Sequence, residues 1–248
     1  MGLQPREPMV AFHSVSEFPG WDMAPEWILN LINEHGSKNV LEVGSGANPT
    51  LAADTVSSLN IRYTANDVSP EELSKADGVY DRWVFDLSQG RIPEEMHGRF
   101  DLVFSRMVNE HISDGRAYHA NIHNLLKPNG LAAHCFSTLY ALPFAANRIL
   151  PEALGGVLLK LFAPRDEHKT GKFRAYYSWS RGPSRGVLSR FEGLGYDVIE
   201  YRGYFGHTYY ARVPLLHQLE RLKARALLAM PIPMLCSYGM MIARKRPA

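Results

Sequence analysis

Short apolar runs alternate with amphipathic segments along most of this chain. The apolar runs predict strands at residues 39–44, 61–67, 82–87, 100–105 and 131–136. Among the helices predicted between and after them, the clearest carries Tyr118, Ile122, Leu125 and Leu126 on one face. Strands that alternate with helices are typical of a mostly parallel sheet covered on both faces. The pattern therefore predicts a doubly wound α/β fold.

The rest of the chain fits a single domain, residues 1–248, with one interruption. Residues 1–36 predict an N-terminal helical extension, in which Trp27, Ile28, Leu31 and Ile32 form an apolar stripe. The alternation stops over residues 137–183, which we expect to form an inserted cap after the fifth strand. A helix after Ser184, a strand at 196–201, a leucine-rich helix from Pro214 and a strand at 235–243 complete the prediction.

Composition narrows the class of protein. The 248 residues include 27 basic and 25 acidic side chains, and a net charge of +2 gives no bulk electrostatic argument for nucleic-acid binding. The two cysteines, Cys135 and Cys236, fit buried free thiols in a reducing cytosol. The uncharged run at residues 226–243 is interrupted by two prolines, which disfavours a bilayer crossing. These features predict a soluble, cytoplasmic protein.

The first strand runs into a loop with the chemistry of a binding site. Glu42 stands two residues before Gly44, and Gly46 follows. Glycines allow a tight turn and a close approach of the backbone to a ligand. We expect a helix from about Pro49, whose first N–H groups would also face the ligand. The carboxylate of Glu42 would repel a pyrophosphate, which disfavours a dinucleotide and hence a dehydrogenase.

Two more acidic residues close the next strands, Asp67 on the second and Asp86 on the third. A carboxylate at the end of the second strand can accept hydrogen bonds from ribose hydroxyls. Three acids at three neighbouring strand ends favour a positively charged nucleoside without phosphates. S-adenosyl-L-methionine, with its sulfonium and ammonium groups, fits this description. The alternative is a structural turn with surface carboxylates, which carries most weight for Asp86 alone.

These motifs resemble those of a known family. The runs VLEVGSGANP, FDL at 85–87, FDLVFSRMVNEH at 100–111 and LLKPNG at 125–130 are similar to the class I S-adenosylmethionine-dependent methyltransferases. The likeness covers roughly residues 25–138 and is greatest to the small-molecule, ubiquinone-biosynthesis-like (type 11) branch. It implies a Rossmann-like fold and S-adenosyl-L-methionine as cofactor.

The resemblance also implies roles for individual residues. Glu42, Gly44 and Gly46 would line the methionine end of the cofactor, and the region of Ser105 would close over it. Asp67 would hold the ribose hydroxyls, with Val68 beside the adenine, which Asp86 and Leu87 would face. The third glycine of the family's loop is Asn48 here. Since Asn tolerates glycine-like backbone angles, we expect the loop to keep its shape.

His111, after the fourth strand, is the candidate general base. A histidine can take a hydroxyl proton as the oxygen attacks a methyl group. An equal alternative is a structural residue that fixes the loop. The position that is acidic in some metal-binding relatives is Met107 here, so no metal site is predicted. His119 and His123 have i, i+4 spacing but no third ligand in view, and a solvated helix face is favoured for them.

Two segments rich in aromatic residues are candidates for binding the methyl acceptor. Residues 160–190 hold eight basic and two acidic side chains interleaved with Phe173, Tyr176, Tyr177 and Trp179. This segment favours contact with an anionic or glycosidic acceptor. An RNA or phospholipid surface is a less favoured hypothesis. The structural alternative is a solvated loop with a few aromatic side chains anchored in the core. A second group, Tyr201, Tyr204, Phe205, His207, Tyr209 and Tyr210, follows a strand that leads to the same edge.

The sequence thus predicts a methyltransferase that modifies an oxygen, less readily a nitrogen, of a small-molecule acceptor. The alternatives are a nucleic-acid methyltransferase, which is disfavoured because no aromatic motif for amino-group methylation follows the fourth strand, and a non-catalytic protein that keeps the cofactor site.

Overall fold

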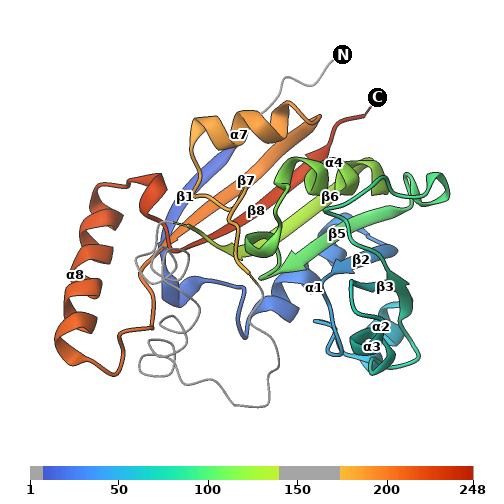
Figure 1. Cartoon of the computed structure of the whole chain (residues 1–248), viewed down its shortest axis with the longest axis horizontal. Helices are drawn as coiled ribbons and strands as arrows, with labels where there is room; N and C mark the ends of the chain where they lie inside the picture. Colours follow the sequence, from blue (N-terminus) through green and yellow to red (C-terminus); the bar gives the residue numbers. More distant parts are fainter. Residues whose placement is uncertain (1–7, 140–173, 248) are drawn as a thin grey trace.

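The computed structural model describes residues 8–139 and 174–247. They form an eight-stranded sheet in the order β1-β7-β8-β6-β5-β2-β3-β4 (Figure 1). All neighbouring strands are parallel except β8, which runs against both β6 and β7. The strands are β1 (Met9–Ser14), β2 (Asn39–Val43), β3 (Arg62–Asp67), β4 (Asp81–Val84), β5 (Phe100–Arg106), β6 (Leu126–Ser137), β7 (Tyr196–Phe205) and β8 (Tyr238–Lys245). The prediction of a mostly parallel α/β fold is confirmed.

Helices cover both faces of the sheet. Buried side chains of α1 (Ala24–His35), α2 (Ala53–Leu59) and α3 (Pro70–Ser74) share one core with inward residues of the strands. Those of α4 (Gly115–Leu125) and α7 (Arg185–Glu192) belong to a second core on the other face. Within β2, Val40 contributes to the first core and Leu41 to the second, because successive side chains of a strand point to opposite faces. The last helix, α8 (Pro214–Ala229), lies beside β1 and β7 (Figure 1).

The N-terminal segment differs from the helical extension that the sequence predicts. Before α1 comes β1, which pairs in parallel with β7 from Met9 opposite Glu200 to Ser14 opposite Phe205. The sequence of this strand lacks the alternation of apolar and polar residues that predicts a half-buried strand, because it lies at the edge of the sheet and none of its side chains is fully buried. In the described part of the chain, no helix has the length and apolar character needed to cross a membrane.

Most of the predicted cap, residues 140–173 with Phe173 among them, lies outside the described residues. At its described end, the ring of Trp179 packs edge-on against Phe191 of α7, with centroids 5.1 Å apart. Tyr177 is buried as well, in a backbone conformation with positive φ. For these two side chains, the structure agrees with the alternative of aromatics anchored in the core.

The prediction of a solvated face for His119 and His123 is wrong. His119 is buried among aromatic rings, with centroids 4.8 Å from Phe191 and 5.5 Å from Trp179. His123 is half-buried, and its ring meets Tyr196 edge-on. Burial lowers the pKa of both imidazoles, because a charged ring would lose its hydration. The error arose because α7 and the segment around Trp179, distant in sequence, cover this face of α4.

A buried hydrogen-bonded group lies next to His119. The hydroxyl of Ser105, in β5, lies 2.9 Å from Oδ1 of Asn109 and 2.7 Å from Nδ1 of His134, in β6. An amide oxygen only accepts, so the hydroxyl donates to Asn109 and Nδ1–H of His134 donates to the hydroxyl. Burial lowers the pKa of His134 to about 3, which keeps the ring neutral. The group ties the turn after β5 to the neighbouring strand.

This buried histidine predicts acid lability. Because the folded-state pKa of about 3 lies below the ordinary 6.5, the unfolded chain takes up the proton first as pH falls. The stabilisation is complete above pH 6.5 and is lost progressively below it, by about 2 kcal/mol between pH 7 and pH 5. In His134→Asn, whose amide can still donate to Ser105, the fall in unfolding free energy between these pH values should shrink by that amount. Urea unfolding at both pH values measures it. The exposed His35→Asn is the control, and an unchanged pH dependence in His134→Asn would refute the assignment.

Candidate functional site

The carboxyl ends of β2, β3 and β5 meet at one edge of the sheet. Val43, the last residue of β2, is paired with Asn66 on one side and with Ser105 on the other. The predicted residues Glu42, Gly44, Gly46 and Asp67 are therefore brought together at this edge. Open parallel sheets bind their ligands at the carboxyl ends of the strands, so this edge is the candidate site.

Glu42 lies beneath the glycine loop and is almost completely buried. Its carboxylate accepts hydrogen bonds from the backbone N–H of Thr50, at 2.9 Å, and from the hydroxyls of Thr50 and Tyr63, both at 2.5 Å. Burial raises the pKa of Glu42, and these hydrogen bonds act in the opposite direction. Glu42 thus joins the start of the loop, at the end of β2, to its far end at Thr50. Its contact with a cofactor stays a prediction.

The two glycines give the loop its shape. Gly44 has φ of +72°, and a Cβ there would collide with Val108. The N–H groups of Gly44 and Ser45 both donate to the carbonyl of Asn66, at 2.8 and 3.0 Å, which holds the start of the loop against β3. Gly46 has φ of +56°, a conformation that side chains other than glycine rarely adopt.

Asp67, at the end of β3, connects the loop to the following turn. Its Oδ2 accepts from the N–H of Gly46 at 3.0 Å, and its Oδ1 accepts from the N–H of Ser69 at 2.9 Å. Each oxygen of a carboxylate can accept a further hydrogen bond. Among the described residues other than its chain neighbours, an added Cβ at Gly46 would meet nothing nearer than Asp67 Oδ2, at 3.9 Å, so this part of the structure leaves the space beside the carboxylate open. With Val68 exposed next to it, this place suits a ribose and an adjoining flat ring.

Asn48 does not need the backbone freedom that the sequence analysis assigned to it. The residue is exposed and has an ordinary negative φ, so the loop requires positive φ at Gly44 and Gly46 but not at the third position. The helix after the loop begins at Ala53 instead of near Pro49. Thr50 lies in the intervening segment, where it hydrogen-bonds to Glu42.

Asp86 and Leu87 follow β4, which is the strand next to β3. Oδ1 of Asp86 accepts from the N–H and the hydroxyl of Ser88, at 2.8 and 2.7 Å, which closes a local turn. The side chain of Leu87 is buried in the core, and its carbonyl accepts from the amide of Asn121 at 2.9 Å. This geometry favours the structural alternative for both side chains, and their cofactor contacts stay predictions. Ser105 is likewise fully buried, so its hydroxyl shapes the turn instead of facing the loop.

His111 ends the short 3₁₀ helix Asn109–His111 that follows β5. Its Nδ1 lies 3.2 Å from the backbone carbonyl of Arg174. A carbonyl oxygen only accepts, so Nδ1 carries the hydrogen, and Nε2 is the basic nitrogen of the neutral ring. The ring is half-buried and stands at the same sheet edge as the glycine loop. This tautomer is the one that a base at Nε2 needs.

Glu110, next to His111, is a site residue that the sequence analysis did not single out. Its Oε1 accepts from the hydroxyl of Ser137, at the end of β6, at 3.0 Å, while Oε2 has no hydrogen-bond partner among the residues that the structure describes. Its carbonyl accepts from the N–H groups of Tyr176 and Tyr177. Burial raises the pKa of the Glu110 carboxyl. The motif Asn-Glu-His marked the place, but its partners come from distant parts of the chain.

Positive charge also reaches this edge. Arg106, the last residue of β5, is exposed and close enough to favour the charged form of Glu42. Arg174, whose carbonyl contacts His111, is exposed and lies over the ring of Tyr176. Within the described ranges, no three His, Cys, Asp or Glu side chains are grouped so that they could hold a metal ion.

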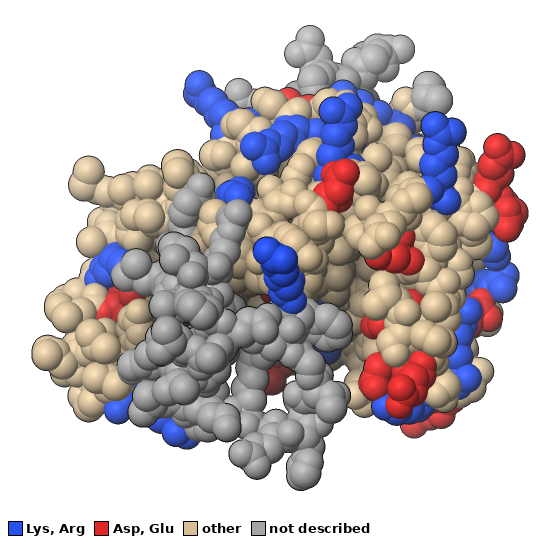
Figure 2. All heavy atoms as spheres, in the orientation of Figure 1, with Lys and Arg blue, Asp and Glu red and all other residues tan. Residues whose placement is uncertain are grey.

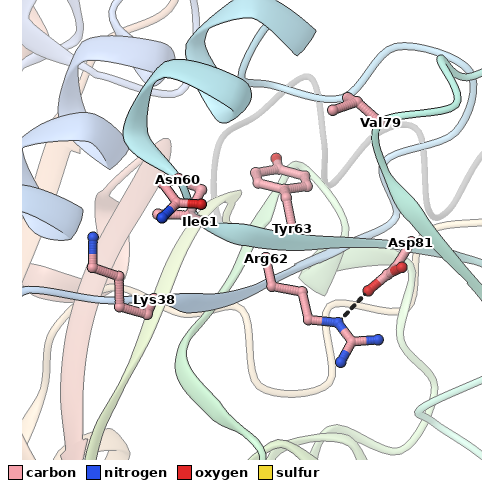
Figure 3. A pocket seen from close by; sticks show the side chains of 7 residues that line it. All are labelled: Lys38, Asn60, Ile61, Arg62, Tyr63, Val79 and Asp81. Atoms are coloured by element: carbon pink, nitrogen blue, oxygen red, sulfur yellow. Dashed lines mark hydrogen bonds and ion pairs between the residues drawn. The ribbon is translucent and has the colours of Figure 1, made fainter.

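A cavity of about 560 Å³ lies elsewhere, near the starts of β3 and β4 (Figure 3). Arg62 and Asp81 form an ion pair across it, with N–O distance 2.5 Å. Since the glycine loop follows the opposite ends of these strands, this cavity does not belong to the candidate site. The close-up shows the seven side chains that line it, Lys38, Asn60, Ile61, Arg62, Tyr63, Val79 and Asp81.

Comparison with known proteins agrees with this geometry. Residues 41–132 match the model of a methyltransferase domain family. Juvenile hormone acid O-methyltransferase of Drosophila melanogaster is 34% identical over 103 residues, which are 38% of this chain and 35% of that protein. The chain thus matches about a third of that enzyme's length.

Solved structures share the fold. Phosphoethanolamine N-methyltransferase 2 of Haemonchus contortus superposes with a TM-score of 0.55 at 15% identity, over 90% of this chain and 53% of that one. The cyclase SpnF gives a TM-score of 0.55 at 16% identity, over 97% of this chain and 89% of that one. At these identities the likeness concerns the fold alone. Residues 41–132 are thus similar to a methyltransferase domain, and the described chain has the fold of these solved structures.

Proposed function

We propose that this protein transfers the methyl group of S-adenosyl-L-methionine to an oxygen of a small-molecule acceptor, with nitrogen as the less favoured atom. The observation that carries the proposal is the space that the described residues leave open beside Gly46 and Asp67. There a carboxylate, already oriented by two backbone N–H groups at 3.0 and 2.9 Å, has accepting capacity left for ribose hydroxyls.

The chain's own residues have three tasks in this reaction. Glu42, through Thr50 and Tyr63, keeps the glycine loop in the shape that leaves the space open. Asp67 binds and orients the nucleoside, and His111 Nε2 takes the proton of an acceptor hydroxyl. When bound, the cofactor would supply a sulfonium methyl carbon: the bond from the acceptor oxygen to this carbon would form as the carbon–sulfur bond breaks, and S-adenosylhomocysteine would leave. Alignment of the two reactants supplies much of the rate enhancement in such a displacement, and a base adds a smaller factor.

The surroundings of His111 favour an anionic acceptor. Arg106 and Arg174 are exposed at this edge and can pair with a carboxylate or a phosphate. The Drosophila melanogaster relative is named for an acid that it methylates on oxygen, and its similarity supports oxygen as the target atom. A carboxylate acceptor would have no proton to lose, whereas a hydroxyl acceptor would need His111.

The alternatives have less support. A nucleic-acid methyltransferase would need an extended cationic surface, and the net charge is only +2. A non-catalytic binding protein has the same fold, and the likeness to a cyclase shows that this fold does not by itself fix the reaction.

Calorimetric titration with S-adenosylmethionine and S-adenosylhomocysteine, followed by a screen for transfer of labelled methyl to carboxylate, hydroxyl and amine acceptors, tests the proposal. Binding of both compounds with methyl transfer to an oxygen is expected. Binding without transfer to any acceptor class would favour the non-catalytic alternative, and absence of binding would overturn the proposal.

Asp67→Ala should weaken binding of S-adenosylmethionine by at least about tenfold. The substitution removes the carboxylate that would accept hydrogen bonds from the ribose hydroxyls, and it removes the acceptor of the Gly46 N–H as well. Hydrogen bonds to charged groups contribute roughly 1.5–3 kcal/mol each. Titration calorimetry measures the change. Asp54→Ala, at an exposed acidic position of α2, is the matched control. Equal affinities in the two variants would remove Asp67 from the binding site.

His111→Gln should lower kcat for a hydroxyl acceptor by roughly 10²–10⁴, the range for loss of a general base, while the affinity for S-adenosylmethionine is kept. The acidic limb of the pH–rate profile should disappear with it, a change that a merely structural role would not produce. The exposed His97→Gln is the control. Unchanged turnover would show that the acceptor needs no base, as expected for a carboxylate.

A further inference from the structure

The helix α8 is built with its polarity reversed. Surface helices of globular proteins normally turn an apolar stripe toward the core and polar residues toward water. On α8, the buried side chains include the charged Glu220, together with Leu227, which packs on Phe205 and Cys236. Leu215, Leu219 and Leu222 are 69%, 54% and 59% exposed.

These three leucines form one continuous stripe. Their spacing of i, i+4 and i+7 places them on the same side of the helix, opposite the buried Glu220. Exposed apolar side chains continue after the helix ends, at Met230, Ile232 and Met234. We call these six residues the leucine face. Figure 2 shows that the side of the molecule over α8 is largely uncharged.

The charges near the leucine face have one sign. Arg212, Arg221 and Arg225 are exposed on or next to α8. Over residues 206–235 the one acidic side chain is Glu220, and it is buried. Its carboxylate is compensated within the helix by Lys223, at 2.7 Å, and lies 3.5 Å from the ring of His207, which burial keeps neutral by lowering its pKa to about 4. The exposed surface of this segment therefore combines apolar and cationic side chains, with no exposed acid.

We propose that the leucine face binds the surface of an anionic lipid bilayer. An amphipathic helix of this kind lies in the plane of the interface, with its apolar side chains among the acyl chains and its basic residues among the headgroups. A symmetric contact between two copies would instead bring the arginines of both helices close together, which like-charge repulsion opposes. This inference does not depend on the proposed enzymatic function.

An environment-sensitive fluorophore on Leu222→Cys tests the insertion directly, since both native cysteines are buried. Its emission should shift to the blue with vesicles that contain phosphatidylglycerol, and not with vesicles of phosphatidylcholine alone. The same label on Val79→Cys, an exposed apolar position in the loop before β4, should not respond to either.

Substitutions separate the apolar from the electrostatic contribution. Co-sedimentation of the full chain with phosphatidylglycerol vesicles should fall by more than about tenfold for Leu219→Glu/Leu222→Glu, and by a similar factor for Arg221→Glu/Arg225→Glu. Val79→Glu should bind like the unmodified protein. Because all altered side chains are exposed, thermal unfolding should show that each variant is folded.

Three results would overturn the proposal. Equal binding to neutral vesicles would contradict the role of the arginines, and absence of binding to both kinds would mean that the face is solvated. A label on residue 222 that is blue-shifted without vesicles would show that protein covers the face. A concentration-dependent mass in light scattering would then identify a second copy as the cover, and a constant monomer mass would identify this chain's own residues.

Discussion

A buried carboxylate must be hydrogen-bonded, and this requirement at Glu42 organises the candidate site. Thr50 and Tyr63 supply its donors, one from the far end of the glycine loop and one from β3. These hydrogen bonds hold the loop against the end of β2. Asp67 can then take the N–H of Gly46 and still face open space. Because the protein's own hydrogen bonds already order the loop, binding of a ligand costs little additional conformational entropy there.

The parts of the site that follow from chain direction could be predicted from the sequence. In parallel strands the carboxyl ends lie at one edge, so Glu42 and Asp67 had to be neighbours once the strands were recognised. Side-chain direction past the strand ends could not be predicted. The Leu87 side chain is buried in the core beneath α4, and the Ser105 hydroxyl belongs to a buried hydrogen-bonded group with Asn109 and His134, which lie on other elements. Asn48 was misjudged since a missing glycine matters only where φ is positive.

His119 and Glu110 show a second limit of sequence reasoning, which concerns covering segments. A helical pattern says which residues share a face but not what packs on that face. Trp179 and α7 cover His119, and Tyr176 and Tyr177 bind the carbonyl of Glu110. These contacts join segments sixty or more residues apart in the chain. The same late segment fixes the tautomer of His111 through Arg174, so the chemistry of the proposed base depends on residues that no local motif contains.

The same limit applies to α8, where it concerns orientation. The spacing of Leu215, Leu219 and Leu222 correctly predicted a helix with one apolar face. The same spacing arises whether that face is turned toward the protein or toward solvent, so it did not predict that the leucines are exposed. The orientation goes with Glu220, because its contact with His207 forms only if that side of the helix faces the protein, whereas its ion pair with Lys223 lies within the helix and fits either orientation. Burial of a charge is costly unless it is compensated, and the small cluster around Leu227 offers little apolar area to offset it. A helix held inward by a polar contact, with its leucines outward, gains its largest remaining apolar burial from a surface outside the molecule.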